Sequence, residues 1–167
     1  MALPASPGLR TTDDDARALA RTILLQARHA ALGTLVPGAN GKSLQPMVTR
    51  VAIVPDRDGL PLMLISALSM HSKALRADPS LSLLLGDVGT RGDPLTQPRL
   101  TLTGRARFLA PMATERAALR TRWLDHQPKA RVYVDLPDFS FVTLGLDQAF
   151  LNGGFGRAYC LAPRDLT

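Results

Sequence analysis

The segment 62–79 constrains the fold most, because an apolar strand runs directly into the start of a helix. Four consecutive apolar residues, 62–65, are typical of a buried strand. Ser69 has the side chain of a good helix N-cap, and the helix that follows it can continue until Asp78 and Pro79 end it. The sequence therefore predicts a helix N-terminus at the end of a buried strand.

The first turn of this helix has the chemistry of an anion site. Its backbone N–H groups have no acceptor inside the helix, and they carry the positive end of the helix dipole. The Ser72 hydroxyl and the Lys73 ammonium would converge on the same point, which suits a phosphate group. His71 lies in the same turn and is either an ordinary surface residue at a helix start or a further phosphate ligand.

The rest of the chain predicts antiparallel strands with helices set between them. Thr12 and Asp15 form a capping-box pattern at the start of the first helix. Turns rich in Gly, Pro, Asn and Asp separate the first three strands, which are therefore most easily antiparallel. We expect helices at 12–29 and 114–126 and strands at 30–36, 46–54, 60–66, 80–85, 99–109, 138–145 and 148–151. This order predicts a mainly antiparallel α+β fold, a small barrel with flanking helices.

The length of the chain predicts one domain. It has 167 residues, 46% of them hydrophobic, which is enough for one well-buried core and short for two. We expect a flexible N-terminal arm at 1–11 and the domain at 12–167. No apolar run reaches about eighteen residues, and three aspartates occupy 13–15, where a secretory signal would be apolar. The sequence thus predicts a cytoplasmic protein without a membrane segment.

Several classes of function find little support. The net charge is +6, but the basic residues are scattered and only 5% of residues are aromatic, so nucleic-acid binding is not expected. The lone Cys160 has no Cys or His at metal-ligand spacing, so we expect no metal site. Neither His71 nor His126 has an obvious serine and carboxylate set for nucleophilic catalysis. The glycines of 152–157 indicate a turn rather than a dinucleotide-binding loop.

Two arginines on predicted strands are candidates for the same site as the helix start. Arg50 follows Thr49 on the second strand, and Arg99 begins the fifth. Arg99 belongs to the polar face of its strand, which either meets solvent or directs this side chain at a ligand. Taken alone, each arginine is an ordinary surface charge.

Several ordered segments together resemble a known family. They are 46–52, 64–75, 78–85, 99–104, an Asp-Phe pair at 138–139 and Gly-Gly-Phe-Gly-Arg-Ala at 153–158. These segments are similar to the pyridoxamine 5′-phosphate oxidase-related FMN-binding split barrels, and most similar to the haem-utilisation branch. The resemblance covers about 16–161. It implies a homodimer of six-stranded split barrels with FMN in a groove at the subunit interface.

The resemblance also implies roles for single residues. Thr49, Arg50 and Val51 would line the flavin, and Ser66 would meet the flavin or its ribityl chain. His71, Ser72 and Lys73 would hold the phosphate, which agrees with the anion site inferred from the helix start. Arg99 would stand where the true oxidases have a glutamine near the flavin.

The sequence departs from the true oxidases at three places. They have an arginine in place of Thr49, an Arg-Lys pair in place of Met70 and His71, and a C-terminal segment for pyridoxal phosphate that is not recognisable here. We therefore expect an FMN-dependent oxidoreductase that transfers hydride or electrons to another small molecule, not a pyridoxamine 5′-phosphate oxidase. The alternatives are a haem-binding or haem-degrading protein of the haem-utilisation type, and a flavin-binding storage module without turnover.

Overall fold

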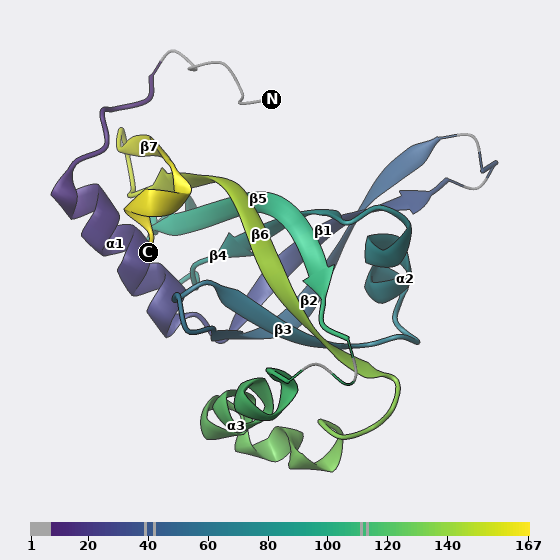
Figure 1. Ribbon diagram of the computed structural model, residues 1–167. Helices are drawn as coiled ribbons and strands as arrows, with labels where there is room; N and C mark the ends of the chain where they lie inside the picture. Colours follow the sequence, from purple (N-terminus) through teal and green to yellow (C-terminus); the bar gives the residue numbers. More distant parts are fainter. Residues whose placement is uncertain (1–7, 39, 42, 111, 113) are drawn as a thin grey trace.

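Six antiparallel strands form a closed barrel with helices around it (Figure 1). The computed structural model describes 8–167 except 39, 42, 111 and 113. The strands are β1 (His29–Pro37), β2 (Leu44–Pro55), β3 (Pro61–Ser66), β4 (Ser80–Leu85), β5 (Arg99–Phe108), β6 (Phe139–Asn152) and β7 (Ala158–Leu161). The α-helices are α1 (Asp14–Gln26), α2 (Met70–Ala77) and α3 (Arg116–His126), and short 3-10 helices are η1 (Pro94–Thr96), η2 (Pro128–Val132) and η3 (Pro163–Asp165).

The pairing of the strands confirms the predicted α+β fold and its six-stranded antiparallel barrel. The order in the sheet is β3-β2-β1-β4-β5-β6-β7, and a further pairing of β3 with β6 closes the barrel. The strand β7 pairs with β6 outside this ring. None of the helices in the described ranges is long and apolar enough to span a membrane.

The barrel is split between β2 and β3. Only Ile53, Val54 and Pro55 of β2 pair with β3, although β2 begins nine residues earlier, at Leu44. The strand β3 instead pairs along its length with β6. The part of β2 before Ile53 therefore has one edge that no described strand covers, and α2 follows directly after β3 at this opening.

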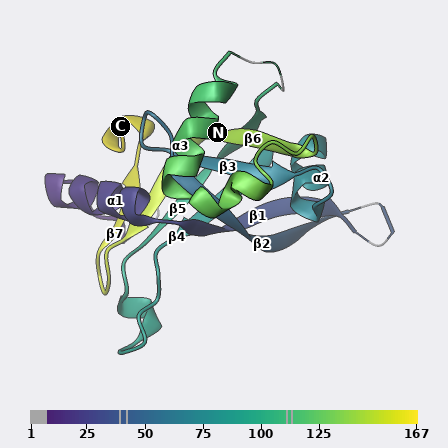
Figure 2. The ribbon, with the colours of Figure 1, turned by 90° about the horizontal axis from the view of Figure 1, so that it is seen from below.

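Two hydrophobic cores share the strand β3. The first fills the barrel interior and extends to α1, α2 and β7, and the second lies outside the barrel between α3, η2 and the outer face of β3 and β6. Figures 1 and 2 show α3 across β3 and β6, with α1 and α2 toward opposite ends of the barrel. Met63 and Ile65 belong to the first core, and Leu62 and Leu64 to the second. The uninterrupted apolar run at 62–65 is the consequence of burial on both faces.

The prediction of two strands at 138–145 and 148–151 is wrong. The structure has one continuous strand, β6, with a bulge: Thr103 pairs with Gln148, but the next residue of β5, Gly104, pairs with Leu146. The extra residue in this bulge is Asp147, which is exposed. In the sequence, this charged residue is typical of a turn between two strands, although the strand continues through it. The strand β7 was also missed, because its four residues follow directly after the glycine-rich turn.

The start of the described chain differs from the expected capping box. Asp13, not Thr12, caps α1, and its carboxylate accepts a hydrogen bond from the Ala16 N–H at 2.7 Å. Thr12 donates its hydroxyl to the Cys160 carbonyl instead, and the Arg10 N–H donates to the Ala158 carbonyl. The first seven residues of the expected arm lie outside the described residues.

Candidate functional site

The predicted helix start lies at the end of β3, beside the split in the barrel. The Ser69 hydroxyl accepts a hydrogen bond from the Ser72 N–H at 3.3 Å, and the Ser69 carbonyl accepts one from the Lys73 N–H at 3.2 Å. These bonds establish Ser69 as the N-cap of α2. The backbone N–H groups of the first two helical residues, Met70 and His71, have no acceptor within the helix, as in every α-helix.

His71 connects α2 to β2 across the opening. Its Nδ1 lies 3.1 Å from the Thr49 hydroxyl oxygen. The imidazole is partly buried, and this burial lowers the pKa of His71 from its ordinary value of 6.5. The ring is therefore mainly uncharged at neutral pH, which is the form that can accept a hydrogen bond or bind a metal ion.

The free edge of β2 offers backbone hydrogen-bonding groups to a ligand. The Ile53 N–H donates to the Arg28 carbonyl on the β1 side. Because antiparallel pairing alternates along a strand, Thr49 and Val51 also direct their backbone groups to β1, while Arg50 directs its own toward the split. Side chains alternate too: Val51 is buried in the barrel and Arg50 is exposed. Arg50 and Thr49 therefore contribute to opposite faces of the strand.

Ser66 and Ser72 do not point at a shared surface with Lys73. Ser66 donates its hydroxyl to Asp138 at 2.5 Å and accepts the Leu68 N–H at 3.1 Å, so it joins the end of β3 to the start of β6. Ser72 is 0% exposed, and its hydroxyl has no hydrogen-bond partner among the described residues. Lys73 is exposed. The expected convergence of the Ser72 hydroxyl with the Lys73 ammonium is therefore absent in this chain.

Arg99 lies away from the other candidates. The register across the sheet runs from Arg50 through Ala31 of β1 and Leu84 of β4 to Thr101 of β5. Arg99 lies two residues before Thr101 on β5, and so three strands away from Arg50. Its guanidinium donates to the carbonyls of Leu95 and Gln97, at 3.1 and 3.3 Å, and so holds the loop that contains η1. Within one chain, the structure brings together Thr49, the Arg50 backbone, His71 and the first turn of α2.

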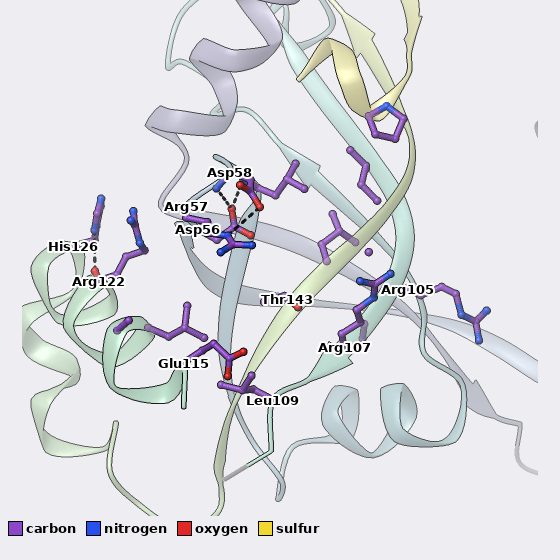
Figure 3. A pocket seen from close by; sticks show the side chains of 18 of the residues that line it. Asp56, Arg57, Asp58, Arg105, Arg107, Leu109, Glu115, Arg122, His126 and Thr143 are labelled. Carbon is purple, nitrogen blue, oxygen red and sulfur yellow. Dashed lines mark hydrogen bonds and ion pairs between the residues drawn. The ribbon is translucent and has the colours of Figure 1, made fainter. Parts of the chain in front are cut away.

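A cavity that the sequence did not reveal lies on another side of the molecule from the split. It is an open groove of about 1380 Å³ between α3, the turn after β2 and the outer faces of β5 and β6 (Figure 3). Its lining includes Arg107, Gly145 and Arg122, which come from three separate elements. In the sequence, only the alternating polar face of β5 hinted at it, because the facing residues lie far away along the chain. None of the predicted site residues lines it.

Comparison with known proteins places this fold in a family. Residues 11–165 match the family model described as "CREG, beta-barrel". The chain is 34% identical over 118 residues to the non-canonical haem oxygenase HOZ of Arabidopsis thaliana chloroplasts, a match that covers 65% of this chain and 35% of that protein. Its sequence therefore spans about a third of that plant protein.

Solved structures support the same grouping. A haem-binding protein from Mycobacterium smegmatis matches with a TM-score of 0.78 and 29% identity, over 95% of this chain and 61% of that one. ChuZ from Campylobacter jejuni matches with a TM-score of 0.79 over 95% of this chain and 63% of its own; at 18% identity this likeness concerns the fold alone. The resemblance to split barrels of the haem-utilisation branch is thus confirmed, and the chain belongs to the CREG-type β-barrel family.

Proposed function

We propose that this protein binds haem at the split between β2 and β3, with His71 as the residue that faces the iron. This function replaces the flavin-dependent oxidoreductase as the main interpretation. The likeness to a plant haem oxygenase and to a mycobacterial haem-binding protein supports it. The observation in this chain that carries it is the partly buried, mainly uncharged imidazole of His71 at the opening of the barrel.

Only one of the three histidines has surroundings that suit an iron ligand. His29 is exposed, and its Nε2 lies 3.4 Å from the carboxylate of Asp87. His126 is also exposed, and its Nδ1 lies 2.9 Å from the Arg122 carbonyl. His71 combines partial burial, a lowered pKa and a hydrogen bond to Thr49 that orients the ring. Orientation of a ligating imidazole by its other nitrogen is typical of metal-binding histidines.

The charges near His71 fit the two carboxylates of haem. Lys73, two residues later, is exposed and forms no ion pair in the described part of the chain. Arg76 lies one turn after it, with its guanidinium 4.1 Å from the centre of the Phe108 ring. Haem would supply the iron; these residues of the chain would bind its carboxylates and orient the ring system at the split.

A second copy of the chain would complete this site. The outer face of β2, β1 and β4 exposes Val48 and Leu84, at 70% and 44%, and the small residue Ala52. The exposed Arg50 lies between Val48 and Ala52 on the same face. Exposed apolar side chains on a strand face are typical of an interface between copies. We therefore propose a homodimer in which the partner covers this face and forms the second wall of the haem site.

Haem titration of the purified protein tests this function. We expect saturable binding with a shifted Soret band, and about tenfold or greater weakening in His71→Ala, together with an altered spectrum of the bound haem. His126→Ala is the matched control, because it removes an exposed histidine on α3, away from the split. Unchanged affinity and spectrum in His71→Ala would exclude His71 as the ligand, and absence of saturable binding to the wild type would exclude the function.

FMN binding is the second candidate, and one observation favours it. The free edge of β2 presents the backbone groups of Arg50, and these could pair with the polar edge of a flavin ring, which haem does not have. The first turn of α2 would then receive the phosphate. Titration with FMN, followed by quenching of flavin fluorescence, separates the two. Tight FMN binding without haem binding would restore the flavoprotein interpretation, with its electron donor and acceptor still to be found.

A further inference from the structure

The groove beside α3 contains one arginine that differs from all the others in its lining. Four arginines line it: Arg57, Arg105, Arg107 and Arg122. Arg57 lies 3.6 Å from the carboxylate of Asp58. The other three arginines have no ion pair within 4.0 Å among the described residues. They differ in their longer-range charge interactions with aspartates.

Two of these three arginines lie close enough to an aspartate to lower its pKa. Hydrogen bonds from Ser80 lower the pKa of Asp78, and the positive charge of Arg105 lowers it further. Burial raises the pKa of Asp56, while backbone hydrogen bonds and the charge of Arg122 oppose that rise. No described residue forms a hydrogen bond or an ion pair within 4.0 Å with the Arg107 guanidinium.

The Arg107 guanidinium occupies space left by a glycine on the adjacent strand. A Cβ atom added to Gly145 would lie 2.9 Å from Nε, 3.1 Å from Nη2 and 3.2 Å from Cζ of Arg107. The planar guanidinium therefore lies against the backbone of Gly145, in space that any other side chain would fill. Figure 3 shows Arg107 next to Thr143, its direct partner in the register of β5 and β6. The Thr143 hydroxyl also has no hydrogen-bond partner in the described structure.

The lining of the groove near Arg107 is partly apolar. Leu109 and Leu119 border the second core, Leu146 borders the first, and all three line the groove. On the α3 side, the carboxylates of Glu115 and Asp125 also line it. Asp147 lines it on the β6 side. The groove therefore offers the Arg107 guanidinium without a hydrogen-bond or ion-pair partner, an apolar surface, and carboxylates that would repel a second anionic group.

We propose that this groove binds an amphipathic organic monoanion, a class that includes aromatic and aliphatic carboxylates and sulfonates. Its acidic group lies on the Arg107 guanidinium and the Thr143 hydroxyl, and its apolar body lies along Leu119 and Leu146. The volume of about 1380 Å³ is ample for a ligand of this kind. This binding site is separate from the split and does not depend on haem or flavin binding there.

The fluorescent probe 8-anilinonaphthalene-1-sulfonate tests this proposal, because it combines an apolar aromatic body with one sulfonate. N-phenyl-1-naphthylamine has the same body without the sulfonate and is the control probe. We expect Arg107→Ala to weaken binding of the sulfonate probe about tenfold or more and to leave the neutral probe unaffected. Arg105→Ala is the matched control variant, because it removes the same charge from the same face of the same strand. Because Arg105 also lines the groove, Arg105→Ala should weaken binding of the sulfonate probe much less than Arg107→Ala does, and it should leave binding of the neutral probe unaffected.

A second variant tests the geometry rather than the charge. Gly145→Ala retains every arginine but displaces the Arg107 guanidinium from the strand. We therefore expect it to weaken binding of the sulfonate probe and to leave binding of the neutral probe unchanged. Equal effects of Arg105→Ala and Arg107→Ala, or equal effects on both probes, would overturn the proposal. Loss of sulfonate-probe binding as the chain self-associates would also overturn it, because a second copy of the chain would then occupy the groove. Haem titration of Arg107→Ala should match the wild type, so the two proposals fail independently.

Discussion

The protonation state of His71 links the candidate site to stability. Burial lowers the pKa of this imidazole in the folded chain below its ordinary value of 6.5. Between the two pKa values the unfolded chain binds more protons than the folded one, so the free energy of unfolding rises with pH in this range. The stabilisation from keeping the ring neutral is complete above the unfolded pKa and is lost as pH falls toward the folded pKa.

We therefore expect the wild type to lose more stability than His71→Gln between about pH 7.5 and about pH 5.5. The glutamine keeps a polar side chain near Thr49 but does not titrate. Urea unfolding at both pH values measures the difference, and His126→Gln, at an exposed position without a carboxylate partner among the described residues, is the control. Parallel pH dependence of all three proteins would contradict the assignment of the lowered pKa to His71.

Lys73 tests the anion site at the start of α2. Its ammonium is exposed and could form a charge-assisted hydrogen bond with a phosphate, so Lys73→Ala should weaken FMN binding about tenfold while riboflavin binding changes little. Lys129→Ala, on η2, removes an exposed lysine elsewhere and serves as the control. Equal losses for FMN and riboflavin would exclude a phosphate subsite at this helix.

The helix α3 depends on one large side chain. Trp123 is fully buried in the second core, with its ring centroid 6.1 Å from that of Phe141. Trp123→Ala should cost about 3–5 kcal/mol of unfolding free energy. Trp123→Phe should cost much less, because the indole N–H has no hydrogen-bond partner in the described structure and none is lost. Urea denaturation followed by circular dichroism measures both variants; similar losses for the two would contradict the packing argument.

The elements themselves were largely predictable from the sequence, whereas the site was predictable only in part. Apolar periodicity and turn residues located α2 and the strands up to β5, because these signals are local. The bulge at Asp147 was not predicted, because the continuation of β6 past this unpaired charged residue depends on pairing with β5. The inward position of the Ser72 hydroxyl depends on how α2 packs, and residue type does not determine this.

At the scale of the whole molecule, the uncovered face of β2, β1 and β4 predicts association. Light scattering should give twice the chain mass of 18.0 kDa. Val48→Asp places a charge at the most exposed apolar position of this face and should shift the protein toward a monomer, whereas Leu25→Asp, on α1, should not. A wild-type protein that stays monomeric and still binds haem would contradict a site shared between two copies.

The burial of β3 on both faces has a consequence for folding cooperativity. The same strand supplies Met63 and Ile65 to the barrel interior and Leu62 and Leu64 to the layer under α3, and its pairing with β6 closes the ring. Detachment of α3 would expose the outer face of the strand that seals the barrel. The α3 layer and the barrel should therefore open together, so backbone amides of β3 should exchange hydrogen only through global unfolding and report the full free energy of unfolding.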